Sequence, residues 1–228
     1  EYCILALLPS YMEREGSSLI YMAKELIRLS IHKDSGFYLN NFEEISKKLK
    51  ALKKQKPKVL LLGVSFALLE LAESYPQDLS GIIIMETGGM KGRRKEVTRE
   101  ELHKILKSAF RVDSIHSEYG MTELLSQAYS KGEGIYYPPP WMRIIIKDPH
   151  DPFETLAPGK SGRINIIDLV LLWILSHRIR SDGNKHLNLL SCYAYDRNKF
   201  ADKKIQWVKI QIYFHFGVFL FDESRKLR

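Results

Sequence analysis

Val59-Leu60-Leu61-Leu62-Gly63-Val64 is the first of two fully apolar runs that decide the fold, and Ile82-Ile83-Ile84-Met85 is the second. The segment Phe66–Ser74 between them has the composition of a helix. Continuous apolar runs are typical of strands that are buried on both faces. A helix that connects two such strands makes a right-handed crossover in a parallel sheet. The stretch therefore predicts an α/β fold, a mostly parallel sheet with helices on both faces.

The rest of the first 169 residues continues this alternation. Further strands are expected at Ile4–Leu8, Ser114–Glu118, Arg143–Ile146 and Arg163–Ile167. Further helices are expected at Ser17–Ser30, Phe42–Lys54, Thr98–Phe110 and Thr122–Tyr129, and Thr98-Arg99-Glu100-Glu101 is a capping box for the third of these. In sheets of this kind ligands bind beyond the carboxyl ends of the strands, so the residues that follow each strand are the functional candidates.

Composition divides the 228-residue chain near Leu169. All nine prolines lie before this point, and of the 14 glycines only Gly183 and Gly217 lie after it. Most of the formal net charge of +8 also falls in this last part. We expect residues 1–169 to form the folded core and residues 170–228 to be a divergent basic tail. That tail is either frameshifted or disordered, or else a small β-rich appendage.

Charge, hydropathy and cysteine content argue against a nucleic-acid-binding protein, a membrane-spanning protein and a disulfide-stabilised protein. The nearly neutral main body offers no electrostatic footprint for nucleic acid. No apolar run approaches the roughly 18 residues of a membrane-spanning helix. Cys3 and Cys192 cannot build a disulfide framework, which fits a reducing, cytoplasmic location. Residues 1–8 have the pattern of a strand that begins before residue 1, so further sequence is expected upstream.

The first functional candidate is Glu86-Thr87-Gly88-Gly89, where a buried strand runs into a glycine pair followed by a basic cluster. Glycines let a planar or phosphorylated ligand approach the backbone because no Cβ blocks it. The alternative is a tight strand-to-helix turn with an exposed basic loop.

The second candidate is the segment Ser117–Glu123, at the end of a short strand. Thr122 is a plausible N-cap, and first-turn amides together with the helix dipole favour an anion there. Glu123 beside a bound phosphate would need a cation between them, which indicates Mg²⁺. The alternative is an ordinary capped helix with an acidic residue that complements the dipole.

At this point the sequence resembles a known family. Tyr119-Gly120-Met121-Thr122-Glu123 resembles the Tyr-Gly-x-Thr-Glu motif of adenylate-forming enzymes. The surrounding segments resemble the acyl-protein synthetase (LuxE-type) family over about residues 1–169: ILALLPSYMEREGSSL, GFYLN, IIMETGGMKGRRKEVTREELH, IHSEYGMTELLSQAYS and PPWMRIIIKDPHDPFE. The fold that this implies is a fragment of the large N-terminal domain of those enzymes, a nucleotide-binding core that lacks its N-terminal part.

The resemblance implies a role for each matching residue. Tyr119 would pack against adenine, Gly120 would keep the adenine slot open, and Met121 belongs to the same nucleotide-binding motif. Thr122 would hydrogen-bond the α-phosphate of ATP, and Glu123 would hold the Mg²⁺ that bridges the phosphates. Two further sets are implied by position: Gly88 and Gly89 at the adenine pocket, and Asp182 at the ribose by ungapped counting.

The reaction implied is ATP-dependent activation of a fatty acid, followed by transfer of the acyl group to a protein thiol. The partners would be the fatty-acid substrate and an acyl-donor or acyl-acceptor protein subunit, as in bacterial bioluminescence. The family's Ser/Thr/Gly-rich phosphate loop has no counterpart here, since Gly16-Ser17-Ser18 is too short and opens a helix. Two alternatives therefore stay open: a truncated, catalytically inactive remnant, and a phenylacetate-CoA ligase-like enzyme.

Three other features of the sequence carry expectations of their own. Cys192, flanked by leucines and a tyrosine, is expected to be a small core residue rather than the acyl-accepting thiol. His116 precedes the motif and is expected to be a core histidine, with contact to substrate as the alternative. Pro138-Pro139-Pro140-Trp141 would form either a wall of the acyl pocket or a surface turn.

Overall fold

A computed structural model of the chain describes residues 2–9, 17–90, 92, 96–121 and 123–170. These residues fall into two compact units. The first unit comprises Glu1–Tyr119 and Tyr129–Tyr136, and the second comprises Gly120–Ala128 and the described residues from Tyr137 onward. The core expected over residues 1–169 is thus shared between both units. Asp182, Cys192 and the rest of the expected tail after residue 170 lie outside the described residues.

Strands and helices alternate along the main sheet, as the sequence predicts. Their order is β1 (Tyr2–Leu7), α1 (Ser18–Ser30), β2 (Gly36–Tyr38), α2 (Phe42–Gln55), β3 (Lys58–Val64), α3 (Ser65–Ser74), β4 (Ile83–Thr87), α4 (Arg99–Phe110), β5 (His116–Tyr119), β6 (Ala128–Ser130) and β7 (Tyr136–Tyr137). The seven strands lie in the order β2-β1-β3-β4-β5-β6-β7. The pairs from β2 through β5 are parallel, which confirms a mostly parallel α/β sheet.

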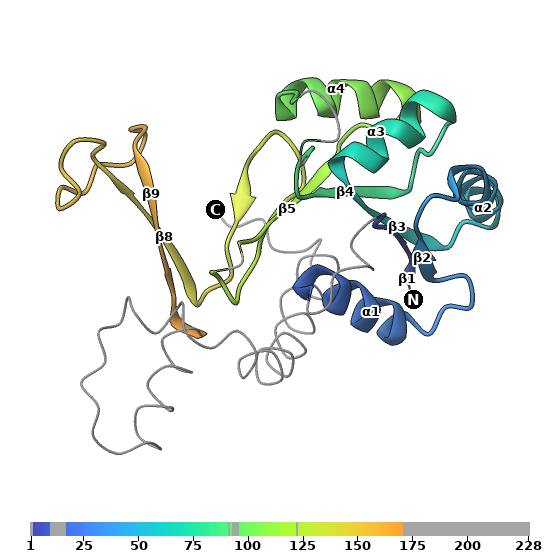
Figure 1. Cartoon of the computed structure of the whole chain (residues 1–228), viewed down its shortest axis with the longest axis horizontal. Helices are drawn as coiled ribbons and strands as arrows, with labels where there is room; N and C mark the ends of the chain where they lie inside the picture. Colours follow the sequence, from blue (N-terminus) through green and yellow to red (C-terminus); the bar gives the residue numbers. More distant parts are fainter. Residues whose placement is uncertain (1, 10–16, 91, 93–95, 122, 171–228) are drawn as a thin grey trace, which may run out of the picture. The chain divides into compact units, whose positions relative to one another are not determined.

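The strand order reverses once, at β1, and this places the helices. Between β1 and β2 the chain moves one way along the sheet, and from β2 through β5 it moves the other way. Because parallel crossovers are right-handed, such a reversal puts α1 on one face and the later helices on the opposite face. Figure 1 shows α1 on one side of the strands, with α3 and α4 on the other.

The core follows from the apolar pattern of these elements. All six residues of β1 are buried, and in β3 only Lys58 is exposed. Helices α1, α2 and α4 each bury one stripe of side chains on the face toward the sheet: Met22, Ala23 and Leu26; Ile45, Leu49 and Leu52; Leu102, Leu106 and Phe110. Gly63 permits close packing of α3 on β3, since a Cβ there would meet Leu68 at 2.7 Å.

Capping residues fix where two helices begin. The Ser17 hydroxyl accepts a hydrogen bond from the amide of Ile20 at the start of α1. At α4, the Thr98 hydroxyl accepts from the Glu101 amide, and the Glu101 carboxylate accepts from the Thr98 amide. The capping box predicted from the sequence is therefore confirmed.

The helix expected over Thr122–Tyr129 is wrong. Thr122 lies outside the described residues, Glu123 lies in a turn, and β6 begins at Ala128. The amide of Leu124 donates to the carbonyl of Met121 at 3.1 Å, which makes a tight turn. The next amide, on Leu125, donates to the Asp168 carboxylate at 3.1 Å instead of to a helical carbonyl. The segment's backbone groups are thus satisfied without a helix.

The second unit contains a two-stranded antiparallel sheet of β8 (Met142–Lys147) and β9 (Arg163–Asp168). Both strands were expected, but they pair with each other instead of extending the parallel sheet. Before β8, the Trp141 indole donates to Ser126 Oγ at 3.1 Å, which ties the proline-rich turn to the segment before β6. Among the described helices, none has the length and apolar character needed to cross a membrane.

Candidate functional site

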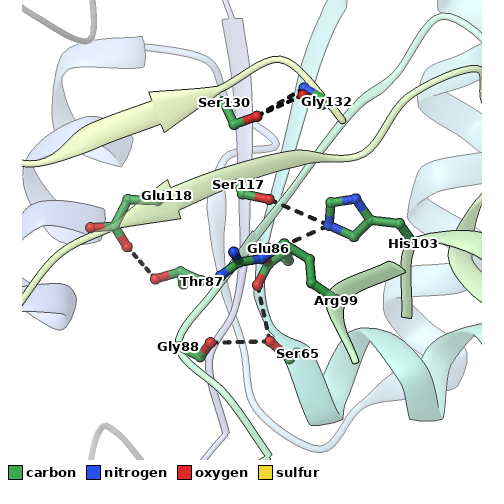
Figure 2. A network of polar contacts seen from close by, with 10 residues as sticks. All are labelled: Ser65, Glu86, Thr87, Gly88, Arg99, His103, Ser117, Glu118, Ser130 and Gly132. Carbon is green, nitrogen blue, oxygen red and sulfur yellow. Dashed lines mark hydrogen bonds and ion pairs between the residues drawn. The ribbon is translucent and has the colours of Figure 1, made fainter. Parts of the chain in front are cut away.

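Polar side chains gather where β3, β4 and β5 end, at the carboxyl edge of the first unit's sheet. Glu86 and Thr87 end β4, and Ser117 and Glu118 lie near the end of β5. Ser65 follows directly after β3. Figure 2 shows these side chains together with two residues of α4. Successive residues of a strand point to opposite faces, so the polar groups divide into two sets.

The first set, which we call the Glu86 network, consists of Ser65, Glu86, Arg99, His103 and Ser117. The Ser65 hydroxyl donates to Glu86 Oε2 at 3.0 Å, and Arg99 Nε donates to Oε1 at 3.2 Å. His103 Nε2 lies 3.7 Å from Oε1 and 3.3 Å from Ser117 Oγ. Both contacts of the imidazole fall on one nitrogen. The network therefore lacks the arrangement of a serine–histidine–carboxylate triad, in which each ring nitrogen faces a different group.

Glu86 is ionised despite its burial. Its side chain is only 3% exposed. Burial alone would raise the pKa of this carboxyl, but the neighbouring His103 and Ser117 side chains act against it, as do the charge of Arg99 and the Ser65 hydroxyl, and the pKa is lowered. The network thus ties α3, α4, β4 and β5 together through one buried charge, with the half-exposed Arg99 as its counter-ion.

The second set is the pair Thr87 and Glu118. The Thr87 hydroxyl donates to Glu118 Oε2. Burial raises the pKa of the Glu118 carboxyl, the hydrogen bond from Thr87 opposes this, and the charge of Glu86 adds to the rise. Two carboxyl groups on neighbouring strands therefore have pKa values displaced in opposite directions, a pattern that is more frequent at functional sites than elsewhere.

Two glycines and an aromatic ring follow directly after these polar groups. Gly88 is exposed and has φ 71°, in the left-handed region that side chains disfavour. Its carbonyl oxygen lies 3.4 Å from the Ser65 hydroxyl. At Gly89 a Cβ would meet nothing within 4 Å, so the backbone there faces open space. The backbone of the glycine pair after β4 is thus accessible, and its expected contact with a nucleotide stays a prediction.

Tyr119, the last residue of β5, belongs to an aromatic group in the same unit. Its ring and that of Tyr136 are edge-to-face, with centroids 6.0 Å apart. The Arg99 guanidinium carbon lies 5.4 Å from the centroid of the Tyr136 ring. A base could stack on such rings, because aromatic faces and guanidinium planes both accept π-stacking.

The remaining motif residues belong to the second unit or lie outside the described residues. Gly120 and Glu123 are exposed, and Met121 is 46% exposed. Thr122 and Asp182 lie outside the described residues, so the ATP contacts expected of them stay predictions. The anion site expected from a helix capped by Thr122 is wrong, because no helix lies in the described residues 123–129. β4 and β5 are parallel neighbours, so Gly88 and Tyr119 lie at the same edge of the sheet.

The chemistry of Mg²⁺ sets the test for the expected metal ligand. No three acidic, histidine or cysteine residues gather into a metal site within the described ranges. Mg²⁺ at nucleotide sites is held by one or two carboxylates together with substrate phosphates, not by an all-protein cage. A single exposed carboxylate such as Glu123 fits that mode of binding.

Glu86 and Ser117 lie in the two candidate segments predicted from the sequence, but neither was assigned a role there, and Arg99 and His103 were not singled out. The role of Glu86 could have been found, because an acidic residue directly after the apolar run at residues 82–85 must be paired once buried. The partners Arg99 and His103 carry no comparable signal, since nothing in the sequence says which turn of α4 meets the end of β4. His116 is half-buried at the start of β5, where burial and the charge of Lys131 lower its pKa to about 4.

Comparisons with known proteins do not extend this description: family models, curated proteins and solved structures were each searched, and none matches the chain.

Proposed function

We propose that this chain carries the nucleotide-binding part of an ATP-dependent, fatty-acid-activating enzyme of the acyl-protein synthetase type. One observation carries the proposal. The two segments that resemble the family, one at Gly88-Gly89 and one beginning at Tyr119, leave neighbouring parallel strands at the same carboxyl edge. That edge is where open α/β sheets bind their ligands.

In the proposed reaction a fatty-acid carboxylate attacks the α-phosphorus of ATP. A P–O bond forms, the bond to the bridging oxygen breaks, and pyrophosphate leaves. A thiolate of a protein acceptor then attacks the acyl carbon, and AMP leaves. Within this scheme Tyr119 and the Gly88-Gly89 turn hold the base, and Thr122 donates to the α-phosphate. Mg²⁺, when bound at Glu123, supplies charge neutralisation of the phosphates.

Nucleotide binding is the first test. The chain should bind ATP in the presence of Mg²⁺, measured by calorimetry. Glu123→Gln should weaken Mg²⁺-dependent ATP binding and leave adenosine binding unchanged, because the carboxylate acts through the ion. Glu154→Gln, which alters another exposed carboxylate of the same unit, should bind as the unmodified chain does. Absence of ATP binding would contradict the proposal.

Fatty-acid-dependent exchange between ATP and pyrophosphate is the second test. Thr122→Ala should slow exchange by about 10²–10³, the usual cost of one positioned donor, without rescue by added Mg²⁺. Glu123→Gln should slow exchange too, with partial rescue at raised Mg²⁺. ATP binding without exchange would favour the inactive remnant, and exchange driven by phenylacetate rather than long-chain acids would favour the CoA ligase.

A further inference from the structure

The ladder between β4 and β5 is short, so the side-chain contact between Thr87 and Glu118 joins the two strands beyond its end. The ladder comprises Met85 opposite His116 and Glu86 opposite Ser117. On its other side, β4 is paired with β3 over five positions that run to the end of the strand, where Thr87 lies opposite Val64. One residue beyond the β4–β5 ladder, the contact between the strands is the hydrogen bond from Thr87 to Glu118.

This contact is separate from the Glu86 network. Glu86 and Ser117 are directly opposite each other and share a face of the sheet, so the residues that follow them point to the other face. Figure 2 draws the Thr87–Glu118 contact apart from the contacts of Glu86 with Ser65, Arg99 and His103. Removing the pair should therefore leave the buried charge of the network in place.

The position of the pair relates it to ligand binding. Gly88 follows Thr87, and Tyr119 follows Glu118, so each partner lies one residue before a residue of the proposed nucleotide site. We propose that Glu118 is a positioning residue, whose carboxylate holds Thr87 and thereby fixes the Gly88-Gly89 turn relative to the Tyr119 ring. The link to nucleotide affinity rests on the proposed function, whereas the ordering of the turn does not.

The electrostatics of Glu118 support a positioning role over a stabilising one. Among the described residues, the ionisable groups that act on Glu118 or feel its charge are Glu86 on β4, Tyr129 on β6 and Tyr136 on β7. None of them is a cation. A carboxyl whose pKa is raised by folding binds a proton more tightly in the native state, so its contribution to stability falls as the pH rises above the ordinary glutamate value. A buried carboxyl whose loss of a proton is opposed by folding, and which accepts a hydrogen bond from the neighbouring strand, is better explained by local order at that strand end than by global stability.

Amide hydrogen exchange in the ligand-free chain tests the positioning directly. Thr87→Val removes the donor and Glu118→Gln removes the charge, while Glu133→Gln serves as a control on an exposed glutamate of the same unit. Both test variants should speed exchange at Gly88, Gly89 and Met90 by about 10–100-fold, the equivalent of one hydrogen bond to a charged group. The exchange rate within β3 should stay unchanged. The melting temperature of Glu118→Gln at pH 7 should be no lower than that of the unmodified chain.

Binding of ATP with Mg²⁺ completes the test. Each single variant should raise the dissociation constant for ATP. The double variant should raise it no further than the more affected single variant, because both substitutions remove the same contact. Unchanged exchange at residues 88–90, or equal acceleration in β3, would overturn the positioning role. If the variants exchange faster but the chain binds no ATP, the positioning role holds and the proposed function is refuted. If the chain binds ATP but the variants change neither exchange nor affinity, the proposed function holds and the positioning role is refuted.

Discussion

Replacing Glu86 by glutamine should lower the free energy of unfolding of the first unit by about 2–3 kcal/mol. The substituted side chain keeps one oxygen, but its amide nitrogen must face either the Ser65 hydroxyl or Arg99 Nε, and both are donors in the present structure. A buried hydrogen bond to a charged acceptor contributes about 1.5–3 kcal/mol. The Arg99 contact adds less, about 0.2–1 kcal/mol, because that side chain is 46% exposed and water screens the pair.

Urea denaturation followed by far-ultraviolet circular dichroism measures this change. With a slope of about 1–3 kcal/mol per molar urea, the midpoint should fall by roughly 1 M or more at unchanged slope. Glu100→Gln, on the exposed first turn of α4, is the matched control and should stay within about 0.5 kcal/mol of the unmodified chain.

The pH dependence gives the prediction a second arm. The pKa of Glu86 is lowered by folding, so its contribution is fully present above the ordinary glutamate value of 4.5 and is lost as the pH falls through the lowered value. The difference between the unmodified chain and Glu86→Gln should accordingly shrink in acid. Equal stability of the two at pH 7, or a difference that persists undiminished at pH 2, would refute the reasoning.

Three further substitutions test local features of the fold. Gly88→Ala should cost about 1 kcal/mol because φ there is 71°, whereas Gly89→Ala, where a Cβ meets open space, should cost less than half of that by urea denaturation. Thr98→Ala should cost about 1 kcal/mol by removing the N-cap of α4, and the amide of Glu101 should then exchange faster; unchanged exchange there would contradict the assigned capping box. Gly63→Ala should cost about 1–3 kcal/mol, since the new methyl group would lie 2.7 Å from a leucine of α3, and a crystal structure with that leucine unmoved would contradict this.

The sequence predicts best the elements whose burial is uniform. The apolar runs of β1, β3 and β4 and the amphipathic pattern of α1, α2 and α4 reflect which side chains contact the core, and long patterns of this kind are the most reliable signal in a sequence. The short strands β2, β6 and β7 were not predicted, because two or three residues give no period. The helix wrongly expected over Thr122–Tyr129 had a favourable local pattern, but the Leu125 amide is satisfied by Asp168, a residue distant in the sequence.

For the candidate site, the sequence indicated two segments that follow neighbouring parallel strands, but not which polar groups meet there. Gly88, Gly89 and Tyr119 follow from the rule that ligands bind at carboxyl edges. Glu86 lay in the first candidate segment without a role of its own, and no pattern singled out His103 on α4. Which polar residue meets which depends on the register of β4 against β5 and on the rotation of α4, and single-sequence patterns specify neither.

The reversal of strand order at β1 has a consequence for how the chain is made. β1 is synthesised before both of its partners, and its six buried residues pair with β2 on one side and β3 on the other. The second edge is covered only after the segment ending at Val64 has left the ribosome. Pairings between strands so distant in sequence form slowly, and unpaired apolar edges promote aggregation in the meantime. The second edge of β1 is therefore unpaired between the emergence of β1 and that of β3, and slower translation of α2 would lengthen that interval.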